Sequence, residues 1–226
     1  MPVYSKDSKL SDVILYDPSV IQVVNRFDIY LGVGDATIKG ICEEHNIEEN
    51  LFLAIINTYL NRNYFPEGIE GRVNLQDGLL DYLEKTDRYY SGILLPNIER
   101  HFSLLLSKSE VKDERSNLFL LKQFFTEVKE EMIGVINTDL SIWFPLLRNG
   151  DGLSHVAADI RKPYDNHLLE EKLSDLINFF VIHLRGDYDQ NLCVAVVSAL
   201  VTLEKDVKQN NRIRDRILKP LCQELL

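Results

Sequence analysis

The sequence has few of the features that mark a secreted, membrane-spanning or zinc-binding protein. Its three cysteines, Cys42, Cys193 and Cys222, lie far apart and form no C-x-x-C pair. This pattern argues against both a disulfide framework and a zinc site. No apolar run reaches the length of a membrane span, and the first residues, MPVYSKDSKLSD, have no apolar signal-peptide core. The sequence therefore predicts a reducing, cytoplasmic setting.

Motifs for nucleotide binding and catalysis are also missing. The pair Gly32-x-Gly34 lacks the third glycine of a dinucleotide fingerprint, because Thr37 stands in its place. We expect a turn with positive φ there instead. No two histidines are four residues apart, and no G-x-S-x-G motif occurs, which excludes a zinc-protease helix and a hydrolase elbow. We therefore expect a protein that is not an enzyme.

Positive charge is scarce, with 25 Lys and Arg against 35 Asp and Glu and a formal net charge of −10. An acidic chain needs a local basic patch to bind nucleic acid. The segment Asn210–Lys219, NNRIRDRILK, is one candidate, and Asp215 interrupts it. We interpret it as the cationic last turns of a helix rather than a DNA contact. Nucleic-acid binding through this chain alone is therefore not expected.

Apolar residues recur at intervals of three and four through most of the chain, which predicts an all-α fold. The first part predicts a small domain of short helices over residues 1–62. The helices are expected at residues 11–15, 18–26, 38–45 and 48–61. Asp17 is the expected N-cap of the second helix, and the third is expected to begin after a Thr37 cap and to end at a left-handed Asn46. In the fourth helix the residues expected to face inward are Leu51, Ile55, Ile56 and Tyr59.

Residues 63–75 contain Pro66 and two glycines, Gly68 and Gly71, and are predicted to form a linker. Longer helices are expected beyond it, at 76–107, 114–144, 163–185 and 189–218. Their connections predict an antiparallel four-helix bundle over residues 76–226. Phe119, Phe124 and Phe125 could form a dimer patch, but we interpret them as core residues.

The order of these segments resembles that of iron-centre repair proteins of the ScdA and YtfE type. VVNRFDIYLGVGDATIKGICEEHNIEENLFLAIINTYLN is similar to their small N-terminal domain. YLEKTDRYYSGILLPNIERHF, FFTEVKEEMIGVINTDLSIWFPLL, EEKLSDL and LEKDVKQNNRIRDRILKPL resemble the four helices of their hemerythrin-like bundle. The resemblance implies a small helical domain followed by a bundle that holds a di-iron site in the family.

Most of the iron ligands of the family have been replaced in this sequence. The resemblance aligns ligand positions with Asp87, Val135, Asp139, Asn166 or His167, Asn210 and Arg214, and an adjacent cysteine pair with Leu31 and Gly32. Valine cannot coordinate iron, and an arginine stays protonated and repels a cation. The two aspartates and His167 could hold at most one metal ion. We therefore expect a degenerate site without metal or cofactor.

Buried carboxylates without a metal need another positive partner. The sequence therefore predicts a buried ion pair between Arg214 and either Asp87 or Asp139. The alternative is that all three side chains face solvent.

These observations predict a non-enzymatic regulatory or sensory interaction protein of bacterial type that binds a protein partner or self-associates. Some relatives carry a DNA-binding domain after the bundle, which suggests a link to transcription. This chain ends at Leu226, so a nucleic-acid role would need a partner or a longer chain. The alternative is an iron-binding protein of the iron-sulfur repair or stress-response type with a reduced metal site. A third option is a small apolar ligand in the emptied bundle, beside Val135.

Overall fold

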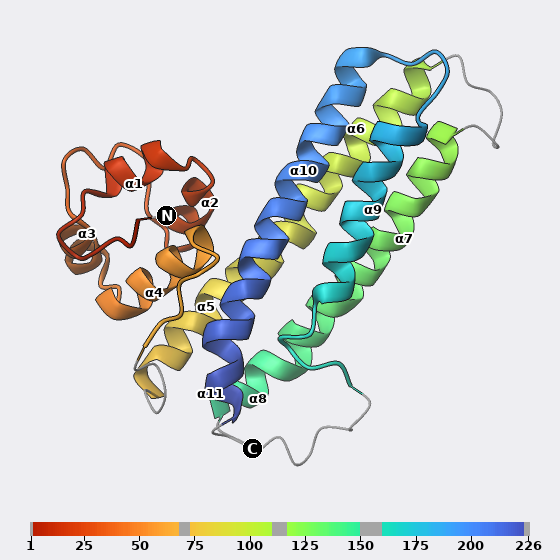
Figure 1. The fold of residues 1–226 in the computed structure, drawn as a ribbon. Helices are drawn as coiled ribbons and strands as arrows, with labels where there is room; N and C mark the ends of the chain where they lie inside the picture. The colour runs from red at the N-terminus through yellow and green to blue at the C-terminus, as the bar shows by residue number, and fades with distance from the viewer. Residues whose placement is uncertain (1, 68–72, 110–116, 150–159, 224–226) are drawn as a thin grey trace. The chain divides into compact units, whose positions relative to one another are not determined.

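The computed structural model describes residues 2–67, 73–109, 117–149 and 160–223. These residues form helices, turns and one isolated bridge between Lys9 and Thr37, and no strand occurs among them (Figure 1). The prediction of an all-α fold is therefore confirmed. The loops predicted between the long helices, KSEVKDERS at 108–116 and RNGDGLSH at 148–155, lie mostly outside the described residues. Within the described part of the chain, no helix combines the length and apolar character that crossing a membrane requires.

The N-terminal helices follow the sequence prediction closely. They are α1 (Leu10–Tyr16), α2 (Val20–Arg26), α3 (Ile38–His45) and α4 (Glu49–Leu60). Both predicted caps of α3 are confirmed, since Thr37 Oγ1 accepts from the Gly40 amide at 3.1 Å and Asn46 has φ 54°. Helix α2 begins two residues later than predicted. Asp17 instead accepts from the amide and hydroxyl of Ser19, which closes a turn before the helix.

The later helices are longer and contain π-helical segments. They are α5 (Val73–Tyr89), η1 (Tyr90–Leu94), α6 (Leu95–Lys108), α7 (Asn117–Thr138), η2 (Asp139–Trp143), α8 (Phe144–Asn149), α9 (His167–His183), α10 (Gln190–Ile213), η4 (Arg214–Leu218) and α11 (Lys219–Gln223). Helical structure therefore continues past Pro145 and Pro220, beyond the predicted ends at 144 and 218.

The chain divides into two compact units, which do not follow the order of the sequence. Unit 1 consists of Met1–Thr86, Ile142–Tyr164 and Gln209–Leu226, and unit 2 of Asp87–Ser141 and Asp165–Lys208. Each unit is therefore assembled from separate parts of the chain. The boundaries predicted at residues 62 and 76 stay predictions.

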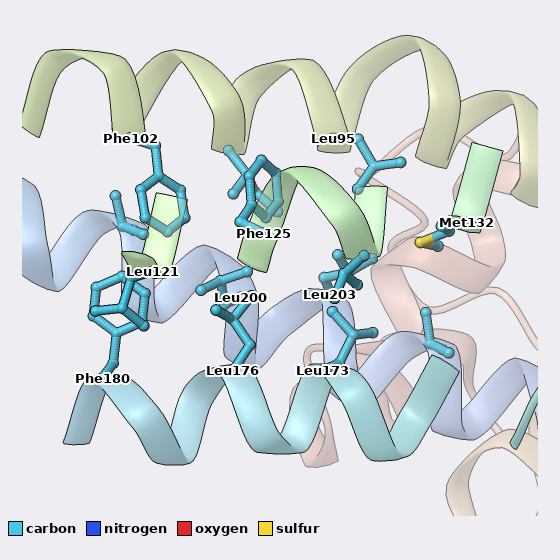
Figure 2. Close-up of a cluster of buried hydrophobic side chains, with 14 of the residues drawn as sticks. Leu95, Phe102, Leu121, Phe125, Met132, Leu173, Leu176, Phe180, Leu200 and Leu203 are labelled. Carbon is cyan, nitrogen blue, oxygen red and sulfur yellow. The ribbon is translucent and has the colours of Figure 1, made fainter. Parts of the chain in front are cut away.

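The core of unit 2 is a cluster of buried apolar side chains contributed by α6, α7, α9 and α10. Phe102 stacks on Phe125 at 5.0 Å between ring centroids and contacts the ring of Phe180 at 5.4 Å. Figure 2 shows these rings and the leucines that extend the cluster along the helices. Phe125 is fully buried, as predicted, whereas Phe119 is 38% exposed.

The core of unit 1 joins the small N-terminal helices to later parts of the chain. Phe27 lies between the rings of Phe52 and Tyr82, at centroid distances of 5.0 and 5.4 Å. Arg148 of α8 pairs with two carboxylates of α5, those of Asp81 and Glu84. These contacts make α5 and α8 part of the same packed unit as α2 and α4.

Candidate functional site

Three of the positions matched to iron ligands carry buried charged side chains. Asp87 and Asp139, in unit 2, are 3% and 0% exposed, and Arg214, in unit 1, is 3% exposed. The alternative in which all three face solvent is therefore wrong. Val135, also in unit 2, is partly buried and packs against the apolar cluster. The side chain at this position thus belongs to the hydrophobic packing.

His167 does not join the buried aspartates. It is the first residue of α9, and its side chain is 56% exposed, with Nδ1 3.4 Å from Glu170 Oε1. The other aligned residue, Asn166, is buried at the N-terminal end of the same helix. The imidazole that the sequence left as a ligand candidate therefore lies on the surface.

Asn210 and Arg214 are the matched positions that belong to unit 1, and both side chains form internal hydrogen bonds. The hydroxyl of Tyr82 donates to Asn210 Oδ1 at 2.9 Å, and Arg26 donates to the Tyr82 oxygen at 3.4 Å. Arg214 donates to the carbonyl of Pro163 at 2.7 Å, and its guanidinium carbon lies 5.7 Å from the ring centroid of Phe144. Arg214 is thus a buried cation that interacts with a backbone oxygen and an aromatic ring.

The predicted ion pair of Arg214 stays a prediction, and a double-mutant cycle measures it. We expect Arg214→Met and Asp139→Asn, or Arg214→Met and Asp87→Asn, to be non-additive by about 1–3 kcal/mol in the free energy of unfolding. Urea unfolding of each single and double variant gives the coupling energy. Additive effects in both cycles would rule out the pair.

The residues at the matched positions do not fit a di-iron centre. Such a centre needs several imidazole and carboxylate ligands on facing helices. Here Val135 is partly buried against the apolar cluster, the His167 side chain is mostly exposed, and Arg214 supplies a cation. Among the described residues, no group of three or more His, Cys, Asp or Glu side chains is arranged to hold a metal ion.

The π-helical segments coincide with these positions. Asp139 and Arg214 are the first residues of η2 and η4, and Asp87 precedes η1 by one helical turn. In each case a proline follows two residues after the segment, in the pattern Ile-(Leu or Trp)-x-Pro at 93–96, 142–145 and 217–220. A proline ring clashes with the carbonyl four residues earlier, and a widened turn relieves that clash. The recurring pattern is a sequence signal for the three segments.

A buried tyrosine–carboxylate pair accompanies Asp87 in unit 2. Tyr90, one turn after Asp87, donates its hydroxyl to Asp206 Oδ2 at 2.8 Å, and both side chains are buried. Asp206 lies in α10 between the buried Leu203 and Val207. A charged residue inside an apolar helical stripe was the signal that could have identified it. Among the described residues of unit 2, three carboxylates are therefore buried, those of Asp87, Asp139 and Asp206.

The basic segment at the end of the sequence interacts with backbone oxygens. We call Gln209, Arg212 and Arg216 the arginine clasp. Arg212 donates to the carbonyls of Thr58 and Tyr59 at 3.0 Å each, and Gln209 also donates to Tyr59.

The third member of the arginine clasp holds the chain that follows α4. Arg216 donates to the carbonyls of Arg62 and Tyr64 and stacks over Phe65 at 4.1 Å. The last carbonyls of a helix lack partners within the helix and attract cations. Arg212 and Arg216 lie in the last turns of α10 and η4, as predicted, and they also supply positive charge to the C-terminal end of α4.

A hollow of about 310 Å³ lies in unit 1 between α2, α3, α4 and α5. Its charged side chains are already engaged: Lys85 pairs with Asp28 at 2.5 Å, Asp81 pairs with Arg148, and Glu48 caps α4. Cys42 lines an adjoining hollow, which shares Asn46, Ile47 and Glu48 with the first. Burial and the nearby Glu49 raise the pKa of Cys42 to about 12, so the thiol is protonated at neutral pH. Neither hollow presents a reactive nucleophile.

Charged side chains on unit 2 form a network from which we predict that stability depends on pH. Lys129 contacts both oxygens of Glu99 at 2.9 Å, and Lys122 lies 3.3 Å from it. The hydrogen bond from Lys129, and then the charge of Lys122, lower the pKa of Glu99. Because the folded pKa is lowered, the stabilisation is present above the unfolded pKa of about 4.3 and is lost as pH falls below it.

Glu99→Gln tests this pH dependence. We expect the variant to be less stable than the natural chain by under about 1 kcal/mol at pH 7, because the pair is partly exposed. The difference should shrink below about pH 4.3. Urea unfolding at pH 7 and below about pH 4.3 gives the free energy of unfolding of the variant and of the natural chain at each pH. The control is Glu130→Gln, because Glu130 is an exposed carboxylate of α7. A difference independent of pH would contradict the role of Glu99.

Comparison with known proteins does not identify a family for this chain. No protein-family model, curated protein or solved structure matches this chain. The resemblance to iron-centre repair proteins therefore rests on the ordered segments of the sequence.

Proposed function

We propose that the protein is a non-enzymatic regulatory or sensory module, built on a hemerythrin-like antiparallel four-helix bundle that has lost its di-iron site. The observation that carries the proposal is the chemistry at the matched ligand positions. A valine in the apolar packing, an exposed histidine and a buried arginine replace groups that would bind iron. A bundle that keeps its packing but not its ligands is suited to binding a partner rather than to redox chemistry.

The packing of unit 2 supports the bundle in this proposal. A single apolar cluster takes its side chains from α6, α7, α9 and α10, and those helices are the ones expected to form the bundle. Side chains of Phe102, Phe125 and Phe180 fill its interior (Figure 2). Apolar packing of this kind stabilises a bundle without a metal.

Metal analysis of the purified chain of 226 residues tests the proposal. We expect iron well below one atom per chain, no oxo-bridge absorption band after anaerobic loading with Fe(II), and a melting temperature unchanged by a chelator. Asp87→Asn and Asp139→Asn serve as matched variants, and neither should change the metal content. Stoichiometric iron that is lost in these variants would overturn the proposal.

The alternative is an iron-binding protein of the iron-sulfur repair or stress-response type with a reduced site. The observation that favours it is the burial of three carboxylates in unit 2, at Asp87, Asp139 and Asp206. Buried carboxylates require protonation, hydrogen bonds or a cation. The same metal analysis separates the two functions.

A reducing, cytoplasmic setting and a protein partner belong to the same proposal. All three cysteines are free and buried, and burial raises the pKa of Cys222 to about 12. A link to transcription would act through such a partner. The clasp arginines Arg212 and Arg216 already bind internal carbonyls, so they are poorly placed to contact phosphates.

A further inference from the structure

The chain before α1 is held on α4 by the side chain of one buried asparagine. Asn57 of α4 is only 2% exposed. Its Oδ1 accepts from the amide of Tyr4 at 2.8 Å, and its Nδ2 donates to the carbonyl of the same residue at 3.0 Å. A residue in extended conformation directs its N–H and C=O to the same side, so Asn57 pairs with Tyr4 as a neighbouring β-strand would.

We call residues 2–5 the N-terminal strap. Its residues other than Tyr4 are exposed, and Val3 is 60% exposed. The chain joins the rest of the fold at the next residue, because the carbonyl of Lys6 accepts from the amide of Lys39 at 2.9 Å. An exposed segment that is held by few contacts opens at a small cost in free energy. The strap can therefore leave α4 while the hydrogen bonds from Lys6 onward are kept.

The surroundings of the Tyr4 ring indicate which side chain the site accepts. The ring makes an edge contact with Tyr16 of α1 at 6.4 Å between centroids. Burial, and then the neighbouring Tyr16, Asp17 and Asp12, raise the pKa of Tyr4. The two carboxylates near the ring favour a basic peptide over an acidic one. The site thus combines a main-chain pair with an aromatic contact and a negative field.

We propose that Asn57 and Tyr16 form a binding site for an extended partner peptide with an aromatic residue and a positive charge, and that the strap closes this site until the peptide displaces it. The seated strap shows that an extended segment with an aromatic side chain fits. When the strap leaves, the amide of Asn57 needs two new hydrogen bonds, and a peptide backbone supplies both, as when a strand joins a sheet edge. This inference does not depend on the presence or absence of iron.

Isothermal titration calorimetry with the peptide acetyl-Pro-Val-Tyr-Ser-Lys-amide, the sequence of residues 2–6, tests the proposal. Two variants of the chain open the site. One lacks residues 2–5, and the other, Tyr4→Pro, keeps the chain length but loses the amide hydrogen and the ring that hold the strap. We expect both to bind the peptide at least about tenfold more tightly than the natural chain, in which few molecules have an open site. Circular dichroism shows whether each variant is folded.

Two further changes test the hydrogen bonds themselves. Asn57→Asp in the variant without residues 2–5 removes the donor to the peptide carbonyl, and N-methylation of the peptide tyrosine removes the donor to Asn57, so each should abolish binding. Asn25→Asp, at an exposed position of α2, is the matched control and should leave binding unchanged. The proposal is overturned if neither folded variant binds the peptide up to about 1 mM. Equal binding by the natural chain, or binding that survives both Asn57→Asp and N-methylation, would also overturn it.

Discussion

Replacing Arg212 and Arg216 of the arginine clasp by methionine is expected to lower the free energy of unfolding by about 3 kcal/mol. Each arginine is a charged donor to at least two backbone carbonyls at the end of α4 or just after it. A hydrogen bond to a charged group contributes about 1.5–3 kcal/mol, and the carbonyls left behind would need new partners. Methionine keeps much of the apolar stem of arginine, so packing changes little.

Urea unfolding and hydrogen exchange measure this effect. The exchange of amides in the last turn of α4 should accelerate in the double variant, because that turn loses its cap. Arg100→Met is the control, since Arg100 is exposed on α6 and donates to the side-chain oxygen of its neighbour Asn97 at 3.3 Å. It should change stability by under about 0.5 kcal/mol. Equal stability of the double variant and the natural chain would show that the clasp contributes nothing.

Phe102→Ala is expected to destabilise unit 2 by about 3–5 kcal/mol, the range for a fully buried aromatic residue. The side chain is fully buried and contacts the rings of Phe125 and Phe180 (Figure 2). Its removal leaves a cavity and also removes two aromatic contacts, each of which is favourable beyond the area buried. The reduced packing should be visible as a lower urea midpoint and a weaker near-ultraviolet dichroism signal.

Phe119→Ala is the matched control for this substitution. Phe119 lies in α7 and is 38% exposed, so its truncation removes less buried surface. We expect a loss of under about 1 kcal/mol. Equal losses in the two variants would mean that Phe102 is not in a tightly packed core.

The parts of the fold that depend on local chemistry could be predicted from the sequence. Helix α3 has the predicted bounds because Thr37 and Asn46 carry their capping chemistry in the residue itself. In α4 the residues predicted to face inward, such as Leu51, Ile55 and Tyr59, are buried, but the residues between them are mostly buried too, so the helix has more than the one inward face that the period predicts.

The parts that depend on distant contacts could not be predicted in the same way. The arginine clasp joins residues that are separated by about 150 positions in the chain. Nothing near Arg212 in the sequence indicates that its partners are the carbonyls of α4. The pair of Tyr90 and Asp206 was missed for the same reason.

The π-helical segments show a further limit of pattern reading. Each one contains about one extra residue per turn compared with an α-helix, which rotates the following side chains by roughly 100°. A helical wheel drawn through Pro96 or Pro145 therefore assigns later residues to the wrong face. Asp139 and Arg214 begin two of these segments, so the rotation affects the residues that follow them in the chain.

Both units contain buried cysteines whose chemical reactivity can report the unfolding of that unit. Cys42 and Cys222 belong to unit 1, and Cys193 belongs to unit 2. A thiol shielded from solvent reacts with a maleimide only when its surroundings unfold locally or completely. The rates of alkylation at these sites, read by mass spectrometry of the natural sequence, would therefore report the opening of the two units separately and without an added label.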